Sequence, residues 1–187
     1  MVDPRVDPIE LVPSRYETWR EQFVAERDRI RDVLEDRDLR ERCHRIEHVG
    51  STAVPDLPAK DIVDVDVVVA DEAVAPVSSV LADDLGGTRV ENSEEWHPLF
   101  REDDGQRFND HVFAASSDGW KVSVVTRDVL RTNADLREEY TQLKRELTAT
   151  HDDLEAYSMG KTEFVDRLLE TAREDDTLEF DFPVPEP

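Results

Sequence analysis

Cysteine and long apolar stretches are what this chain of 187 residues has least of. Cys43 is its only cysteine, which excludes an internal disulfide and fits a reducing compartment. We expect it to be a small buried apolar side chain. No apolar run reaches the length of a transmembrane helix, and the first residues lack a basic region followed by an apolar one. The sequence therefore predicts a soluble, cytoplasmic protein with no membrane partner.

Positive charge is also scarce. The chain carries 23 Lys and Arg against 46 Asp and Glu, for a formal net charge of −23, and lysine stands only at positions 60, 121, 144 and 161. The acidic residues are spread between strong apolar runs, which argues against a disordered acidic protein. We expect instead a folded, halophilic protein whose surface carboxylates are screened by high cytoplasmic salt. Such a surface argues against nucleic acid as a stable partner.

The apolar pattern predicts a single domain over residues 1–187, long enough for a core of two packed layers. Residues 1–13 contain three prolines and predict an extended arm, and residues 175–187 predict a loose tail. Helical spacing predicts a helix that follows Ser14 and runs to about Asp38, and further helices over 72–85, 135–149 and 153–173. Strand patterns cover 42–49, 62–70, 88–92, 97–101 and 106–115.

The most informative segment is Ile46–Val69, which reads IEHVGSTAVPDLPAKDIVDVDVVV. Its second strand carries Asp64 and Asp66 within a Val/Ile run. Side chains alternate across a strand, so both carboxylates lie on one face and Val63, Val65 and Val67 on the other. Carboxylates on a strand built for burial require a cationic partner. The spacing predicts Asp64 and Asp66 as ligands of Mg²⁺ or Mn²⁺, the metals that such oxygen ligands suit.

A turn, Gly50-Ser51-Thr52, precedes this strand. Glycine lets the backbone approach a ligand closely, and successive N–H groups in such a turn suit a phosphate oxygen. A Gly-Ser-Thr turn alone is ordinary. Followed by the Asp-x-Asp strand, it predicts a phosphate-binding turn beside a metal site.

The segment EHVGSTAVPDLPAKDIVDVDVVV closely resembles the signature of the GrpB family, in the nucleotidyltransferase-fold superfamily. The resemblance runs from about Val12 to Leu169 and includes the blocks TRDVLRTNADLREEYTQLKREL and YSMGKTEFVDRLL. It implies an α+β fold with a nucleotidyltransferase-like, mixed, mostly antiparallel sheet flanked by helices, and a helical C-terminal part. It also implies a cleft beside the Gly-Ser turn, but no settled reaction.

Three positions depart from the family pattern. Asp56 stands where a glycine is usual, and Asp61 where a proline is common. The strand that typically carries a His-x-His pair reads Asn109-Asp110-His111, which weakens any zinc site that needs both imidazoles. A third carboxylate has no clear counterpart, because Asp110 lies on the opposite strand face from His111. We expect His111 to take the third catalytic position beside the two aspartates.

The scarce cations are candidates for neutralising phosphate charge. We assign this role to Lys60, Arg127 and Lys161, beside the Gly50-Ser51-Thr52 turn. For Lys144 we favour an ordinary ion pair on a helix surface. Of Glu47 and His48, which alternate along the first strand, only one can face the cleft.

The segment 119–131 sets local propensity against resemblance. Its β-branched residues, in WKVSVVT, favour a strand, whereas the resemblance makes it a helix. Helical spacing would place Trp120, Val124 and Arg127 on one face, with Arg127 one turn before Arg131. Tertiary burial commonly outweighs propensity differences of this size, so we predict a helix from about Gly119 to Arg131.

Two functions follow. The first is a metal-dependent nucleotidyltransferase-like enzyme, in which Gly50 and Ser51 hold the triphosphate and Asp64 and Asp66 hold the metal. The second is a non-catalytic module that binds a nucleotide or another phosphorylated small molecule, including a coenzyme A-related one, because the family's domain is also found fused to enzymes of coenzyme A biosynthesis. The missing third carboxylate favours the second, and the intact Gly-Ser and Asp-x-Asp pair favours the first.

Overall fold

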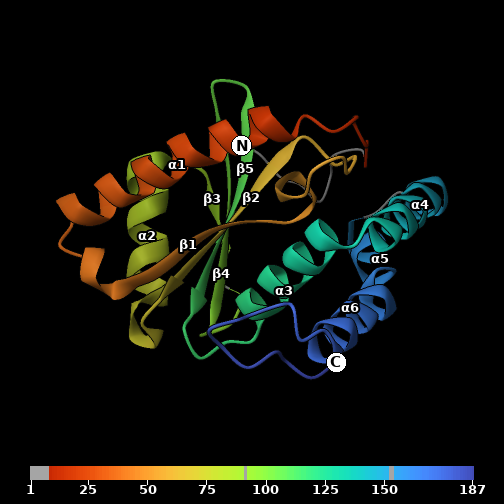
Figure 1. Ribbon diagram of the computed structural model, residues 1–187. Helices are drawn as coiled ribbons and strands as arrows, with labels where there is room; N and C mark the ends of the chain where they lie inside the picture. The colour runs from red at the N-terminus through yellow and green to blue at the C-terminus, as the bar shows by residue number, and fades with distance from the viewer. Residues whose placement is uncertain (1–8, 91, 152–153) are drawn as a thin grey trace.

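A mixed five-stranded sheet forms the centre of the molecule (Figure 1). The computed structural model describes residues 9–90, 92–151 and 154–187, with the backbone alone for 154 and 155. The strands lie in the spatial order β1-β2-β5-β4-β3; β2 and β5 are parallel and the other neighbours antiparallel. Their bounds are Cys43–Val49 (β1), Ile62–Val69 (β2), Thr88–Arg89 (β3), Trp96–Asp103 (β4) and Gln106–Ala114 (β5). The predicted mixed, mostly antiparallel sheet flanked by helices is confirmed.

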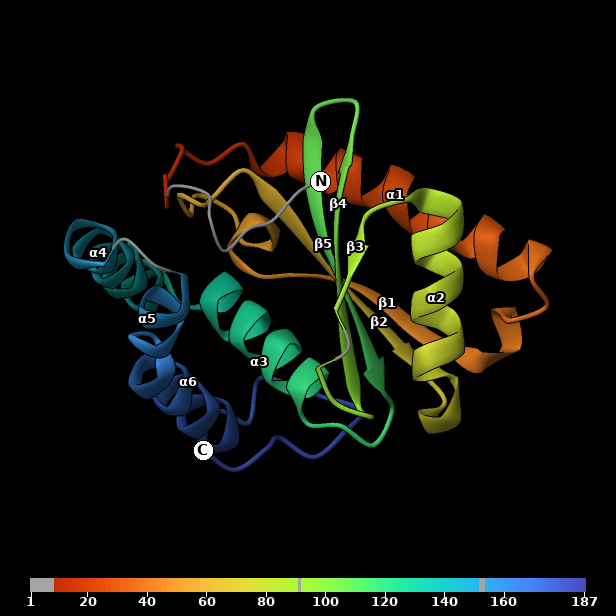
Figure 2. The ribbon, with the colours of Figure 1, turned by 180° about the vertical axis from the view of Figure 1, so that it is seen from behind.

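Helices lie on both sides of the sheet, as the two opposite views show (Figures 1 and 2). One side carries α1 (Tyr16–Asp36) and α2 (Val74–Leu85). The other carries four helices: α3 (Gly119–Thr132), α4 (Ala134–Thr150), α5 (Leu154–Met159) and α6 (Thr162–Glu174). Three short 3₁₀ turns complete the described part, at Arg40–Arg42, Ser51–Ala53 and Asp71–Ala73. No helix in the part of the chain described here is both long and apolar enough to cross a bilayer.

The alternation along β2 decides which side becomes the main core. Val63, Val65, Val67 and Val69 are fully buried in one cluster with side chains of α1 and α2. On the opposite face, Val68 packs with Phe113, Trp120 and Val124 beneath α3. Asp64 and Asp66 lie on this second face, as the strand pattern predicts. The aspartates therefore lie between the sheet and the C-terminal helices α3 to α6.

A buried charged triad joins α1 to the sheet on the opposite face. The guanidinium of Arg101 donates to Asp110 Oδ2 at 2.5 Å and to Glu26 Oε1 at 2.6 Å. All three side chains are 1% exposed or less. Burial raises the pKa of Glu26, against the opposing charge of Arg101. Asp110 thus lies on the opposite strand face from His111, as predicted, and belongs to the structural core.

The segment 119–131 is helical, which confirms the prediction made against local propensity. Trp120, Val124 and Arg127 share its buried face. The predicted helix over 153–173 is wrong as a single element, because α5 ends at Met159 and α6 begins at Thr162. Gly160, a poor helix former, lies at this break. The strand predicted over 88–92 is confined to Thr88–Arg89 in the described residues.

The C-terminal segment 175–187 corrects the expected loose tail. Four of its apolar side chains are partly buried against the apolar clusters around α3 and α6: Leu178, Phe180, Phe182 and Val184. The rings of Phe182 and Trp120 lie 4.8 Å apart, and Asp181 pairs with Arg45 at 3.0 Å. The apolar residues alternate, which is the pattern of an extended segment with one buried face. Of the expected N-terminal arm, residues 1–8 lie outside the described part, and Val12 forms a bridge to Ala59.

The two loop departures from the family pattern have structural counterparts. Asp56 has a φ of 62°, in the left-handed region that glycine enters without cost. The carboxylate of Asp61 accepts a hydrogen bond from Trp19 Nε1 at 2.9 Å and pairs with Arg15. Asp61 therefore fastens the start of α1 to the loop that precedes β2.

Candidate functional site

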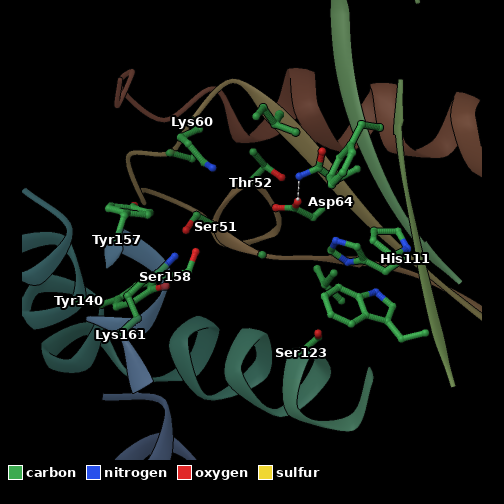
Figure 3. A pocket seen from close by; sticks show the side chains of 18 residues that line it. Ser51, Thr52, Lys60, Asp64, His111, Ser123, Tyr140, Tyr157, Ser158 and Lys161 are labelled. Atoms are coloured by element: carbon green, nitrogen blue, oxygen red, sulfur yellow. Dashed lines mark hydrogen bonds between the residues drawn. The ribbon is translucent and has the colours of Figure 1, made fainter. Parts of the chain in front are cut away.

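A cavity of about 390 Å³ opens between the Gly50-Ser51 turn, the aspartate face of the sheet and the helices α4 and α5 (Figure 3). Seven residues that the sequence singled out line it: Gly50, Ser51, Thr52, Lys60, Asp64, His111 and Lys161. Side chains from distant parts of the chain complete its walls, among them Trp96, Asn109, Ser123, Tyr140, Tyr157 and Ser158. In Figure 3 the lysines and tyrosines lie on one side of Ser51, and Asp64 and His111 on the other.

Gly50 is required at the turn for two reasons. Its backbone has φ 69° and ψ −170°, a region essentially restricted to glycine. A Cβ at this position would also collide with Asp64 Oδ2 and lie 3.1 Å from Asp64 Cγ. The absence of a side chain therefore lets the turn lie directly against the Asp64 carboxylate. Thr52 is 1% exposed, and its hydroxyl is bonded to His48 Nε2 at 3.0 Å, so its role is to hold the turn.

Three of the four lysines of this acidic chain gather at the cavity, and we call Lys60, Lys144 and Lys161 the lysine cluster. Lys144 corrects the prediction of a surface ion pair: it is 1% exposed. Its Nζ donates to Ser51 Oγ at 3.1 Å and to the carbonyl of Pro58. Lys144 lies behind the Gly-Ser turn and supports it from α4. The fourth lysine, Lys121, instead pairs with Asp118 at the start of α3.

Two tyrosines pack against the amines of the lysine cluster. Lys161 Nζ lies 4.2 Å and Lys60 Nζ 5.8 Å from the ring centre of Tyr157, and Lys144 Nζ lies 5.0 Å from that of Tyr140. Burial raises the pKa of Tyr140 to about 12 and that of Tyr157 as well. Both phenols are therefore neutral at physiological pH, and they stabilise the amines through their ring faces.

Two members of the lysine cluster, Lys144 and Lys161, have lowered pKa values. Burial, and then the charge of Lys161, lower the pKa of Lys144 to about 7. Burial and the charge of Lys60 lower the pKa of Lys161 to about 8, against the attraction of Asp64. Desolvation disfavours the charged ammonium, and neighbouring like charges add to it. An anionic ligand would therefore stabilise the charged ammonium forms of Lys144 and Lys161.

Asp64 and Asp66 differ in exposure although they share a strand face. Asp64 is half-buried and lines the cavity, and its Oδ1 accepts from Asn109 Nδ2 at 3.1 Å. Asp66 is fully buried, and its Oδ1 is bonded to His111 Nδ1 at 3.0 Å. The parallel register of β2 and β5 makes both pairs, since Asp64 lies beside Asn109 and Asp66 beside His111.

The pKa values of Asp66 and His111 are both raised, but for different reasons. Burial raises the pKa of Asp66, against the hydrogen bond and charge of His111. Burial lowers the pKa of His111, but the hydrogen bond and charge of Asp66 and the charge of Asp64 outweigh it, so the net direction is upward. The imidazole is held in one orientation at the edge of the cavity, with Trp96 in edge contact at 6.0 Å between ring centres.

The carboxylates fit a divalent cation only in part. Oδ2 of Asp66 is buried and has no hydrogen-bond partner among the described residues, and Asp64 lies beside it on the same face. However, the described part of the chain contains no group of three His, Cys, Asp or Glu side chains arranged to hold a metal. Mg²⁺ is often bound by one or two carboxylates together with substrate phosphates. The donor set therefore fits a cation that arrives with a phosphorylated ligand better than a cation bound alone.

Arg127, which the sequence assigned to phosphate, does not line the cavity. Its guanidinium donates to Glu47 at 2.8 Å, to the carbonyl of His48 at 3.0 Å and to Asp128 at 2.7 Å. Arg127 therefore fastens α3 to β1. Neither Glu47 nor His48 lines the cavity. Glu47 pairs with Arg127, and His48 stacks on Phe23 in the core. Burial lowers the pKa of His48 to about 3.

Comparison with solved structures identifies related folds. The crystal structure of the conserved protein GrpB from Enterococcus faecalis has the same fold, with a TM-score of 0.74 and 23% identity over 88% of this chain and 98% of that chain. One chain of the Cid1 poly(U) polymerase aligns with a TM-score of 0.49 and 13% identity, over 78% of this chain and 51% of its own.

Sequence relatives agree with the structural match. UPF0157 protein BH1888 of Halalkalibacterium halodurans is 33% identical over 158 residues, which cover 82% of this chain and 77% of that protein. The family model described as GrpB protein matches residues 8–171. The chain belongs to the GrpB family.

Proposed function

We propose that this chain binds a nucleoside triphosphate in the 390 Å³ cavity and transfers its nucleotidyl group to an acceptor. The observation that carries the proposal is the placement of the lysine cluster and Ser51 on one side of the cavity and Asp64 on the other. In a chain of net charge −23, three neighbouring lysines create a local positive potential that attracts a phosphorylated ligand. The same net charge favours a small ligand over nucleic acid.

The residues of the site divide into two groups. Lys60 and Lys161 line the cavity and would pair with phosphate oxygens, while Gly50 lets the backbone of the turn approach them. Mg²⁺ or Mn²⁺ held by Asp64 and Asp66 would neutralise charge on the phosphates. His111, whose Nδ1 is fixed by Asp66, is oriented to exchange a proton near the acceptor.

Ligand-induced stabilisation tests the binding step. We expect nucleoside triphosphates to raise the melting temperature in molar KCl, and to raise it further with Mg²⁺. Lys161→Met should reduce the shift, whereas Lys121→Met, which removes the lysine distant from the cavity, should leave it unchanged. The proposal is wrong if no nucleotide stabilises the protein with or without Mg²⁺.

A second candidate, a non-catalytic module for a nucleotide or a coenzyme A-related phosphometabolite, is favoured by the environment of Asp66. That carboxylate is fully buried and bonded to His111, which removes it from free contact with a ligand. Pyrophosphate release separates the two candidates. Release from a Mg²⁺–nucleotide in the presence of small-molecule acceptors, abolished in Asp64→Asn, supports transfer. Binding of nucleotide or coenzyme A without release supports the module.

A further inference from the structure

Ser51 and Lys144 form a hydroxyl–amine pair in the wall of the cavity. Lys144 Nζ lies 3.1 Å from Ser51 Oγ, within hydrogen-bond reach. Ser51 is half-buried and lines the cavity, whereas Lys144 is 1% exposed and approaches the turn from α4. A ligand in the cavity can therefore reach the hydroxyl, while the amine is shielded from bulk water. A serine beside a desolvated base is the arrangement of an activated nucleophile.

A third group holds the amine in place beside the hydroxyl. Lys144 Nζ donates to the carbonyl of Pro58. A neutral amine can keep this bond and accept a hydrogen bond from Ser51, because a serine hydroxyl is both donor and acceptor. Burial, and then the charge of Lys161, lower the pKa of Lys144 to about 7, so the amine can exchange a proton near neutral pH. Nucleophile, base and orienting group are thus all present.

Ser51 projects from a turn whose position is fixed. Gly50 lies directly against the carboxylate of Asp64, where a Cβ would collide with Oδ2. The backbone carbonyl of Ser51 accepts from Val54 N at 3.3 Å. A hydrogen bond between Tyr140 and Ser51 opposes the rise that burial causes in the Tyr140 pKa. In Figure 3, Ser51 lies between the labelled lysines and tyrosines on one side and Asp64 on the other. The hydroxyl therefore lies where the phosphates of the proposed ligand would be bound.

We infer that Ser51 is a nucleophile that accepts the nucleotidyl group and that Lys144 is its base. This inference rests on the proposed nucleotidyl transfer. In the first step Ser51 Oγ attacks the α-phosphorus and the Oγ–P bond forms. The bond from that phosphorus to the oxygen bridging to the β-phosphate breaks, pyrophosphate leaves, and the hydroxyl proton passes to Lys144 Nζ.

The second step returns the pair to its starting state. The hydroxyl of the acceptor attacks the phosphorus, the Oγ–P bond breaks, and Lys144 gives its proton back to Ser51 Oγ. The proton of the acceptor passes to solvent. The transfer is therefore a double displacement, in which the nucleotidyl group is held as an ester of Ser51 between the two steps.

Isotope exchange between labelled pyrophosphate and a nucleoside triphosphate tests the inference and requires no knowledge of the acceptor. The full chain is incubated in molar KCl with Mg²⁺, labelled pyrophosphate and each common ribonucleoside triphosphate in turn. Because the first step is reversible, pyrophosphate that attacks nucleotidyl-Ser51 carries the label into the triphosphate. We expect this exchange without any acceptor, together with a nucleotidyl adduct that mass spectrometry of peptides places on Ser51. Direct transfer from nucleotide to acceptor produces neither signal.

Three variants assign the roles. Ser51→Ala should abolish exchange and adduct while nucleotide still raises the melting temperature. Lys144→Met should slow the exchange by about 100-fold or more, since a positioned general base typically contributes that much. Lys121→Met, which changes the lysine distant from the cavity, should match the unmodified protein. If Lys144→Met is poorly folded by circular dichroism, the mapped adduct and Ser51→Ala decide the test.

The outcomes separate this inference from the proposed function. Exchange and an adduct on Ser51, both lost in Ser51→Ala, support the inference. Nucleotide binding without exchange or adduct overturns it, as does an adduct on another residue or a phosphate on Ser51 in place of the nucleotidyl group. Pyrophosphate release that requires an acceptor and persists in Ser51→Ala also overturns it and leaves the proposed function intact. Absence of any nucleotide binding overturns both.

Discussion

The contact between Gly50 and Asp64 allows a stability prediction with an internal control. Gly50→Ala places a methyl group where the backbone has φ 69° and ψ −170° and where Asp64 Oδ2 already lies. Gly86 offers a matched position, because its φ of 77° and ψ of 179° fall in the same region while an added Cβ meets nothing within 4 Å. The two substitutions therefore share the backbone penalty and differ in the collision.

The magnitudes can be worked from these two terms. The backbone conformation costs about 1–3 kcal/mol for a residue other than glycine, and overpacking adds about 1–3 kcal/mol. Asp64 cannot turn away freely, because its Oδ1 accepts a hydrogen bond from Asn109 at 3.1 Å. We therefore expect Gly86→Ala to lower the free energy of unfolding by the first term alone, and Gly50→Ala by about 2–6 kcal/mol in total.

Urea unfolding at fixed KCl measures both variants, and a double-mutant cycle isolates the collision. In an Asp64→Ala background the carboxylate is gone and only its Cβ remains, 3.2 Å from the position of the new methyl group. The cost of Gly50→Ala should fall there to nearly that of Gly86→Ala. Equal costs for Gly50→Ala and Gly86→Ala, or a cost of Gly50→Ala unaffected by Asp64→Ala, would refute the reasoning.

Three further predictions concern charge. Asp64→Asn should abolish the additional stabilisation that Mg²⁺ gives to a nucleotide complex, without loss of stability in the free protein, because it removes one of two like charges; an unchanged Mg²⁺ effect in thermal shift contradicts this. The melting temperature should decrease when the KCl concentration is lowered below about 0.5 M, because exposed carboxylates are then less screened; a melting temperature independent of KCl contradicts a halophilic surface. Because the pKa of Lys144 is about 7 in the folded protein and about 10.4 when unfolded, the unfolded state binds more protons between these values. Lys144 should therefore add about 1 kcal/mol to the free energy of unfolding per pH unit from pH 8 to 9, so the rise over this interval should be smaller by that amount in Lys144→Met. The same pH dependence of the free energy of unfolding in both proteins, measured by urea unfolding, would refute it.

Much of the cavity could be predicted from the sequence because its residues are local to one signature. The Gly50-Ser51 turn and Asp64 lie within fifteen residues of one another, and strand alternation fixes which face Asp64 occupies. His111 could be added only through the family resemblance. Its pairing with Asp66 depends on the parallel register of β2 and β5, which brings together residues 45 positions apart. Local patterns contain no information about that register, so the burial of Asp66 could not be predicted.

Lys144 was placed wrongly although a signal was present. On α4 it belongs to the same buried stripe as Tyr140 and Leu147, at helical spacings of four and three residues. A lysine inside an apolar stripe indicates a buried amine rather than a surface ion pair. The scarcity of lysine in this chain strengthens that indication. The ring contacts of Tyr140 and Tyr157 with the amines depend on tertiary packing and have no counterpart in the local sequence.

Arg127 illustrates the limit of assigning cations by type. The prediction that it shares a helical face with Trp120 and Val124 is confirmed, but that face packs on β1 rather than on the cavity. Glu47 and the carbonyl of His48 engage the guanidinium there. Helical spacing gives the buried face of α3, whereas the rotation of the helix relative to the cavity is set by the whole core.

The Glu26–Arg101–Asp110 triad constrains how this sequence can change over evolutionary time. Removing one member of a buried charge group leaves a partner without compensation and typically costs about 3–5 kcal/mol, a large share of the stability of a small domain. Replacing all members by apolar residues of similar volume is often neutral or stabilising. An apolar replacement of the triad that keeps the stability therefore requires all three residues to change together. We expect the three positions to be inherited as a unit, so that the attachment of α1 to β4 and β5 persists while the surface around it diverges.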